Sequence, residues 1–400
     1  MHPCKAASAA GLLAALMAMA VVPTSVRADD GAVAAAGSGA AEARPRAREA
    51  GVVIGSLPTG PLNAIVDVDG VAVGHVTVHE GDSVRTGVTA IVPHPGDLFA
   101  ERVPAAIHVA NGFGKLLGVT QVRELGELET PVLLTGTLGV WQAADAMVGW
   151  LLAQPGMAQV RSINPVVGET NDGFLNDIRA RPLRPEHVVQ ALQSASTTDA
   201  REGAIGAGTG TVAFGWKGGI GTSSRRLPDA RGGHTVGVLV QSNYGGELTI
   251  AGVPVGRHLP DPASVAAGQA AHAPSTGDGS IMIVVATDAP LDARQLQRLA
   301  ARATVGLART GAAMSNGSGD YVIAFSTAPA SRRRPDVPLQ APAALSNEAM
   351  DGLFVAVAEA TEEAIVNSMF RAGTMRGHRG TVPALPLEQV LPPLQQHGPR

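Results

Sequence analysis

The sequence predicts a layered α/β protein, and three features of the chain carry this prediction. Residues 235–241 and 281–287 are mainly apolar runs rich in Val and Ile, which is typical of strands buried on both faces. Residues 292–310 and 347–370 carry apolar residues at helical spacing, as amphipathic helices do. Because groups of strands and groups of helices follow one another, layers are favoured over a strict series of βαβ units.

Further elements are predicted in the N-terminal half. Residues 64–74 alternate apolar residues with turn residues, which predicts a β-hairpin, and 87–93 and 105–109 predict buried strands. Residues 138–153 and 184–194 predict helices, the first followed by Pro-Gly and the second starting with a proline. In the C-terminal helix we expect Asn347 to be the N-cap and Gly373 to lie near the end.

The N-terminus has the composition of an export signal. Lys5 precedes an apolar run at 6–22, and Val26-Arg27-Ala28 fits a small-residue cleavage site, so residues 1–28 are predicted to be a signal peptide. The alternative is an uncleaved anchor, for which a run of roughly 17 residues is marginal. A periplasmic or secreted protein with no membrane segment in its mature form is therefore expected.

Residues 29–50 are rich in Ala, Gly, Ser and Arg without periodicity and are predicted to be a disordered linker. One catalytic domain would then span residues 51–400. The only cysteine, Cys4, precedes the apolar run, so the mature chain would hold no disulfide, thiolate nucleophile or cysteine zinc site.

The composition is that of a globular protein without a strong charge bias. Hydrophobic residues make up 45% and charged residues 16% of the 400, with a formal net charge of −4, so no nucleic-acid partner is expected. The segment 206–211 lacks the spacing of a dinucleotide-binding loop. His75 and His79 lie in an alternating segment and would not converge as on a helix, so no metal site is predicted.

The segment Gly279-Ser280 ends a loop rich in small residues and enters the apolar run at 281–287. An ordinary junction between a loop and a strand is one interpretation. The other is self-cleavage, in which the Ser280 hydroxyl attacks the Gly279 carbonyl and water then releases a new chain starting at Ser280. The freed α-amine, with a reference pKa of about 7.7–8.0, would serve as the base for the neighbouring hydroxyl.

Three more side chains could support this chemistry. Ser318 and Asp320 lie two residues apart before an apolar strand and would share a face if extended, although a plain polar turn is the alternative. Asn243 follows the apolar run at 235–241 and could donate a hydrogen bond to an oxyanion, or simply hold a turn.

At these residues the chain resembles the L-aminopeptidase/D-Ala-esterase/amidase family, also called the DmpA family, which includes the β-peptidyl aminopeptidases. The resemblance extends from about Asn63 to Gly380 and rests on several blocks that occur in order. The blocks are Asn63–Val68 with Val73–His75, Arg85–Thr89, Pro165–Thr170, Lys217–Arg225, Val240–Asn243, Gly279–Ser280 and Ser318–Asp320.

The resemblance implies a four-layer αββα sandwich, no metal or organic cofactor, and a homo-oligomer that is often a tetramer. It implies autoproteolysis into an α chain, 29–279, and a β chain, 280–400. By position, Ser280 matches the nucleophile, Ser318 and Asp320 the residues supporting it, Asn243 the oxyanion donor, and Glu169 an acid near the substrate amino group. Family members can carry a tyrosine just after the Gly-Glu block, whereas residues 171–174 contain none.

The expected function is that of a self-processing N-terminal-nucleophile aminopeptidase, amidase or esterase acting on short peptides, amino amides or esters with a free amino group. Whether L-α-, D- or β-aminoacyl groups are preferred is not evident from any motif. Two alternatives are an acetyltransferase of the ornithine acetyltransferase type, whose members use Thr where this chain has Ser280, and a non-catalytic periplasmic ligand-binding protein that would stay a single chain.

Overall fold

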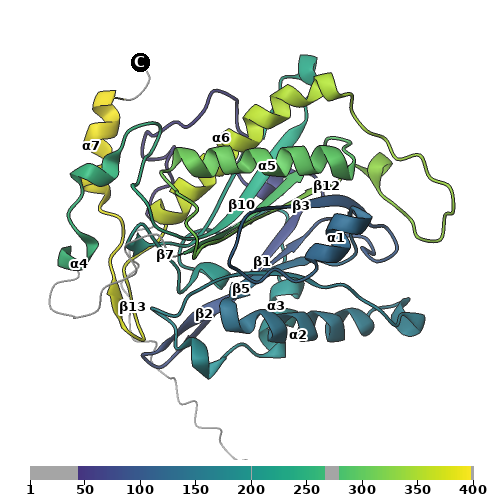
Figure 1. The fold of residues 1–400 in the computed structure, drawn as a ribbon, viewed down its shortest axis with the longest axis horizontal. Helices are drawn as coiled ribbons and strands as arrows, with labels where there is room; N and C mark the ends of the chain where they lie inside the picture. The colour runs from purple at the N-terminus through teal and green to yellow at the C-terminus, as the bar shows by residue number, and fades with distance from the viewer. Residues whose placement is uncertain (1–43, 200, 266–278, 398–400) are drawn as a thin grey trace, which may run out of the picture. The chain divides into compact units, whose positions relative to one another are not determined.

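Two β-sheets lie face to face between two layers of helices in the computed structural model, which describes residues 44–199, 201–265 and 279–397 (Figure 1). The first sheet has four strands, in the spatial order β1 (Ala72–Glu80), β2 (Val84–Val92), β5 (Val132–Gly136) and β6 (Val166–Thr170). The second has six, in the order β4 (Glu127–Leu128), β3 (Val103–Gly112), β12 (Gly319–Ser326), β11 (Ser280–Thr287), β10 (Thr235–Asn243) and β9 (Ile220–Arg226).

Helices cover the outer face of each sheet. The first sheet packs against α2 (Val140–Leu152) and α3 (Pro185–Gln193), and the second against α5 (Ala293–Arg309) and α6 (Asp351–Phe370) (Figure 1). One apolar core lies between the sheets and one between each sheet and its helices. The expected αββα sandwich is therefore confirmed.

The remaining elements are short and lie around these layers. They are helices α1 (Val119–Leu125), α4 (Pro262–Val265) and α7 (Leu387–His397) and the two-stranded ribbons β7 (Val212–Ala213) with β8 (Trp216–Lys217) and β13 (Met375–Gly377) with β14 (Gly380–Val382).

The centre of the six-stranded sheet brings the ends of three strands together. Every residue of β10, β11 and β12 is buried, which accounts for their largely apolar sequences and confirms the predicted core strands. Strand β11 runs antiparallel to β10 and parallel to β12. The end of β10 and the beginnings of β11 and β12 therefore meet at one edge of the sheet.

The predicted hairpin at 64–74 is wrong, because the hairpin formed by β1 and β2 begins at Ala72. Residues Ile65–Asp67 instead form a 3-10 turn. The Asp67 carboxylate accepts hydrogen bonds from the backbone N–H groups of Leu62 (2.9 Å) and Ala64 (3.0 Å). These local bonds favour a turn, which the alternation of apolar residues does not report.

The other predicted strands and helices of the N-terminal half are confirmed by β2, β3, α2 and α3. In α5 the Asp292 side chain accepts from the Gln295 N–H (2.7 Å), and the Gln295 side chain accepts from the Asp292 N–H (3.1 Å). This reciprocal cap fixes the start of the helix where the sequence predicted it.

The predicted cap of the last long helix is wrong. Asn347 lies in a 3-10 turn that precedes α6, and its side-chain oxygen accepts from the guanidinium groups of Arg294 (3.2 Å) and Arg298 (3.0 Å). The asparagine thus ties α5 to the start of α6 rather than satisfying the helix N–H groups.

Helix α6 is also not amphipathic, because its second half is buried on all sides. It carries buried carboxylates that are paired with arginine side chains. Arg225 on β9 is fully buried and forms ion pairs with Glu359 (3.1 Å) and Glu363 (2.7 Å). Charge pairing rather than solvent exposure therefore accommodates the polar residues of α6.

The described part of the predicted linker is packed against this network. Ala47 is fully buried and donates its N–H to the Asn367 side chain (2.9 Å), and Arg48 pairs with Glu363 (2.9 Å). The prediction of disorder is therefore wrong for residues 44–50, because their arginines find acceptors far away in the sequence. Residues 29–43 and the predicted signal peptide lie outside the described residues.

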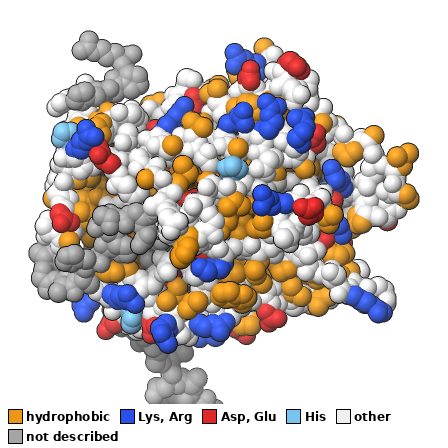
Figure 2. Space-filling model, in the orientation of Figure 1, with side chains coloured by type: hydrophobic (Ala, Val, Ile, Leu, Met, Phe, Trp, Pro, Cys, Tyr) orange, Lys and Arg blue, Asp and Glu red, His pale blue; other side chains and the backbone are white. Residues whose placement is uncertain are grey.

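The surface carries a mixture of side-chain types. On the face drawn in Figure 2, Lys and Arg side chains are scattered among acidic and apolar ones, with a short row over α5. Within the described residues no helix is long and apolar enough to cross a membrane.

Removal of the Arg225 guanidinium should destabilise the fold strongly. Arg225→Ala would leave the carboxylates of Glu359 and Glu363 buried without this partner, and breaking such a pair costs about 3–5 kcal/mol. Arg226→Ala is the matched control, because the neighbouring side chain is exposed and should change the free energy of unfolding by less than about 0.5 kcal/mol. Denaturant unfolding of both variants measures the difference, and equal effects would contradict the importance of the buried network.

Candidate active site

The expected nucleophile lies at the sheet edge where three strand ends meet. Ser280 is the first residue of β11, is 6% exposed, and pairs in register with Asn243 on β10 and with Gly319 on β12. Three sequence segments that are far apart in the chain are thus brought together by strand pairing alone.

One backbone N–H group contacts both the hydroxyl and the carbonyl of the Gly279-Ser280 segment. The Gly319 N–H lies 3.1 Å from the Gly279 carbonyl oxygen and 3.2 Å from the Ser280 Oγ, so both oxygens accept from it. This donor holds the hydroxyl next to the preceding carbonyl and polarises that carbonyl. Such an arrangement is suited to attack by the hydroxyl, with the N–H group stabilising negative charge that develops on the carbonyl oxygen.

The glycine before Ser280 is required by close packing. A Cβ atom at Gly279 would lie 2.4 Å from the Tyr244 Cα and 2.5 Å from the Asn243 carbonyl oxygen. These are backbone atoms of the neighbouring strand end, which cannot move aside as a flexible side chain could. Any larger residue at position 279 would therefore displace Ser280 from its partner strands.

Ser318 and Asp320 share a face, as the sequence predicted. The Ser318 hydroxyl donates to the Asp320 Oδ1 (2.6 Å), and each of the two residues is 2% exposed. Asp320 lies opposite Ile281 in the parallel register, one residue from the Ser280 nitrogen. Its Oδ2 is buried and has no hydrogen-bond partner among the described residues.

Burial raises the pKa of Asp320 to about 6, and the hydrogen bonds from Ser318 and from the Ile281 N–H only partly oppose this effect. The carboxylate is therefore held in a site where a nearby positive charge would stabilise it. In this structure neither Ser318 nor Asp320 bonds to the Ser280 hydroxyl, whose described partner is the Gly319 N–H.

Asn243 presents its amide in a defined orientation. Its side-chain oxygen accepts from the Val212 N–H (2.9 Å), so the NH2 end is the part that remains for another acceptor. The residue is 7% exposed and lies directly opposite Ser280. This geometry suits a donor to an oxyanion better than a residue that only holds a turn.

Glu169 reaches the same region from the other sheet. It lies on β6, is 2% exposed, and accepts hydrogen bonds from the Lys115 N–H (2.8 Å) and from the Thr137 hydroxyl. Burial raises its pKa, and these two hydrogen bonds partly oppose the rise.

Two glycines allow the backbone to pass closely between Glu169 and Ser280. A Cβ at Gly319 would meet the Gly114 Cα at 2.8 Å and the Ser280 Oγ at 3.2 Å, and a Cβ at Gly114 would lie 3.3 Å from the Glu169 Oε1. The loop after β3 and the start of β12 thus approach each other between the hydroxyl and the carboxylate.

Tyr321 is a residue of this region that the sequence did not single out. Its hydroxyl accepts from the Gly114 N–H (3.1 Å), which leaves its own hydrogen available to donate. It lies two residues after Gly319 and therefore on the Ser280 face of the sheet, a relation that strand alternation could have revealed. Residues 171–174, where family members can carry a tyrosine, instead contain Asp172, which bonds to Thr86 and Asn176.

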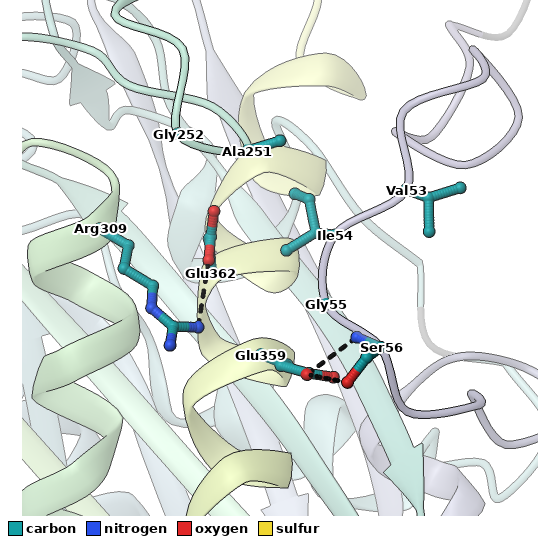
Figure 3. A pocket seen from close by; sticks show the side chains of 9 residues that line it. All are labelled: Val53, Ile54, Gly55, Ser56, Ala251, Gly252, Arg309, Glu359 and Glu362. Carbon is teal, nitrogen blue, oxygen red and sulfur yellow. Dashed lines mark hydrogen bonds and ion pairs between the residues drawn. The ribbon is translucent and has the colours of Figure 1, made fainter. Parts of the chain in front are cut away.

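A cavity of about 590 Å³ lies elsewhere, beside α6 (Figure 3). Its polar lining consists of the Arg309–Glu362 ion pair (3.6 Å) and of Glu359, which accepts from the Ser56 N–H and hydroxyl. No residue of the sheet-edge site lines this cavity. Over the described ranges, no group of three or more His, Cys, Asp or Glu side chains converges to hold a metal ion.

The sequence matches a known family and several related proteins over most of its length. A model of Peptidase family S58 matches residues 63–382. The β-peptidyl aminopeptidase BapA of Sphingosinicella microcystinivorans is 41% identical over 370 residues, which cover 88% of this chain and 92% of that protein.

Solved structures show the same fold. A β-aminopeptidase from a Burkholderia species has 40% identity and a TM-score of 0.80, with 89% of this chain and 100% of that chain covered. The L-aminopeptidase D-Ala-esterase/amidase of Ochrobactrum anthropi, described as a variant of the Ntn hydrolase fold, has 38% identity and a TM-score of 0.81 over 89% and 99%. These matches confirm the expected resemblance and do not favour an acetyltransferase or a non-catalytic binding protein.

The buried carboxyl of Asp320 should make the stability of the uncleaved chain depend on pH. Its pKa in the folded chain is about 6, whereas an unfolded aspartate ionises near about 3.9, so the unfolded chain loses its proton first as the pH rises. The free energy of unfolding should therefore decrease as the pH rises from about 4 to about 6, and it should then level off. In a Ser280→Ala background, which keeps both proteins uncleaved, Asp320→Asn should show a shallower fall by denaturant unfolding. Superimposable pH profiles would contradict the assigned burial effect.

Proposed function

The chain belongs to peptidase family S58 and is a serine-type aminopeptidase, and we propose that it forms its active site by cutting itself between Gly279 and Ser280. The observation that carries this proposal is the Gly319 N–H group, which donates to both the Ser280 Oγ and the Gly279 carbonyl oxygen. The nucleophile and the bond that it would break are thereby held side by side at a donor suited to the developing charge.

Self-cleavage proceeds in two steps, an N-to-O acyl shift and an ester hydrolysis. The Ser280 Oγ adds to the Gly279 carbonyl carbon, the bond from that carbon to the Ser280 nitrogen breaks, and the nitrogen takes the hydroxyl proton. The product is an ester between Gly279 and the Ser280 Oγ with a free α-amine. Water then hydrolyses the ester, leaving a carboxylate at Gly279 and the hydroxyl of a new N-terminal serine.

In the processed enzyme the new amine acts as the base for its own hydroxyl. Its reference pKa of about 7.7–8.0 lies close to neutral pH, so roughly a tenth of it is unprotonated at pH 7 and can accept a proton. The buried Oδ2 of Asp320, which lacks a described partner, supports a role in holding the amine once it carries the proton. Ser318 holds this carboxylate through its hydroxyl.

Peptide hydrolysis repeats the same acyl chemistry on a substrate. The Ser280 hydroxyl attacks the substrate carbonyl, its proton passes through the α-amine to the leaving amine, and water hydrolyses the resulting acyl ester. We assign the Asn243 NH2 group to the oxyanion, supported by the fixed orientation of the amide and by its pairing with Ser280. The Tyr321 hydroxyl is a further donor on the same face of the sheet.

Glu169 is assigned to the free amino group of the substrate. A substrate ammonium near this carboxylate would favour its ionised form, which burial otherwise disfavours. The close contact between Gly114 and Gly319 brings the Glu169 carboxylate and the Ser280 hydroxyl into the same region. The names of the BapA and Burkholderia relatives, at 41% and 40% identity, support β-aminoacyl groups as the preferred acyl part.

The proposal extends to where the enzyme is located and how it assembles. The charged start, the apolar run at 6–22 and the small residues near Ala28 support a cleaved signal and a periplasmic or secreted enzyme. The family resemblance supports a homo-oligomer, with a tetramer as the expected form.

Purified protein should consist of two chains, because self-cleavage requires only groups within the fold. Edman sequencing of the shorter chain should begin Ser-Ile-Met-Ile, and Ser280→Ala should stay a single chain without hydrolase activity. Thr287→Ala, at the far end of the same strand, serves as a control that should still be cleaved. Full activity in a chain that mass spectrometry finds intact at 279–280 would refute the proposal.

The substrate assignment predicts an order of turnover among aminoacyl p-nitroanilides. The β-alanyl compound should have a higher kcat/KM than the L-alanyl and D-alanyl compounds, and N-acetyl-β-alanyl p-nitroanilide should not be cleaved because it offers no ammonium to Glu169. Glu169→Gln should raise KM for the free-amine substrate by about ten-fold, the effect of losing one charged contact. A preference for the L-alanyl compound would reject the β-aminoacyl assignment and leave the self-cleavage proposal intact.

A further inference from the structure

Lys217 is a fully buried lysine that the chemistry above does not use. It ends strand β8, which pairs with β7, and the register places Lys217 opposite Val212. A buried ammonium is costly unless it is paired or fully hydrogen-bonded, so its presence beside the active-site strands calls for a physical reason.

The ammonium of Lys217 is satisfied entirely by backbone carbonyl groups. Its Nζ donates to the carbonyl oxygens of Gly208 (3.0 Å), Thr211 (2.9 Å) and Gly218 (2.7 Å). Three acceptors use all three hydrogens of an ammonium, whereas a neutral amine could serve only two of them. Burial lowers the pKa of Lys217 to about 7, and the negative charge of Asp172 opposes this shift. The three carbonyl groups favour the charged form further.

One of the three acceptors leads directly to the expected oxyanion donor. The Thr211 carbonyl and the Val212 N–H belong to the same peptide unit. The carbonyl accepts from Lys217, and the N–H donates to the side-chain oxygen of Asn243 (2.9 Å). A continuous series of hydrogen bonds therefore runs from the ammonium through one peptide unit to the Oδ1 of Asn243. The NH2 group at the other end of this side-chain amide remains free to donate to another acceptor.

Polarisation along such a chain has a definite sign. A cation at the Thr211 oxygen draws electron density towards it and makes the Val212 N–H a stronger donor. A stronger donor at the Asn243 Oδ1 in turn makes the Asn243 NH2 group a stronger donor. Hydrogen bonds that are linked in this way strengthen one another, particularly in a dry, low-dielectric environment.

We propose that Lys217 is a positioning residue whose buried ammonium orients and polarises the Asn243 side-chain amide through the Thr211–Val212 peptide unit. The inference rests on the proposed role of Asn243 at the oxyanion of the substrate. Lys217 acts only through this chain and does not touch the reacting atoms.

The arrangement separates peptide hydrolysis from self-cleavage. The Gly279 carbonyl oxygen already accepts from the Gly319 N–H, which belongs to β12 and has no bond to Lys217 or Asn243 in the described structure. Loss of the Lys217 charge should therefore slow the hydrolysis of substrates while self-cleavage continues. A purely structural role would impair both reactions together.

The test is a double-mutant cycle with Lys217→Met and Asn243→Ala, using β-alanyl p-nitroanilide as the probe. Asn243→Ala should lower kcat by about 100-fold, as expected for an oxyanion donor. Lys217→Met should lower kcat by about ten-fold with KM changed less than about two-fold, and should still yield two chains. The double variant should be no slower than Asn243→Ala, because the lysine acts only through the asparagine.

Each unfavourable result has a distinct meaning. If kcat of Lys217→Met equals that of the parent, or if the two effects multiply in the double variant, the proposed chain of polarisation is wrong. If Asn243→Ala has the parent's kcat, the oxyanion assignment itself fails. If Lys217→Met does not accumulate as folded protein, the same double-mutant cycle is measured with Lys217→Gln, which keeps two N–H donors without the charge. An unchanged kcat in Lys217→Gln would likewise overturn the role of the charge.

Discussion

The parallel pairing of β11 with β12 is the constraint on which the rest of the site depends. This register sets Ser280 beside Gly319, so that a single N–H group reaches both the hydroxyl and the preceding carbonyl oxygen. A shift by one residue would turn the serine to the other face of the sheet and lose both contacts. The two strands are buried on both faces between the helices and the first sheet, and this burial specifies the register strongly.

Close backbone approach is the second requirement of the site. The chain passes Ser280 on both sides with no room for a side chain at Gly279 or at Gly319. These glycines are needed for space and not for an unusual backbone conformation, since neither adopts a positive φ.

Two buried cations organise the protein in different ways. Arg225 is neutralised by carboxylates of α6 and thereby allows a polar helix to be covered on all sides. Lys217 is hydrogen-bonded by neutral carbonyl groups and not by a carboxylate, so its charge acts directly on the peptide units that surround it. Arg225 joins segments distant in sequence, whereas Lys217 fixes one local loop and is linked through hydrogen bonds to Asn243 at the catalytic edge.

The sequence by itself determined the layered α/β class, the three core strands, the position of α5 and the residues that gather at the sheet edge, because these depend on local patterns and on short motifs. A Gly-Ser pair before an apolar strand and a Ser-x-Asp pair before another are visible without any knowledge of long-range contacts. The tertiary structure alone decided the burial of α6, the anchoring of residues 44–50, and the parts played by Tyr321 and Lys217. Each of these depends on a partner distant in sequence or on a loop conformation that no local pattern specifies, and the cost of burying a polar group can be judged only when that partner is known.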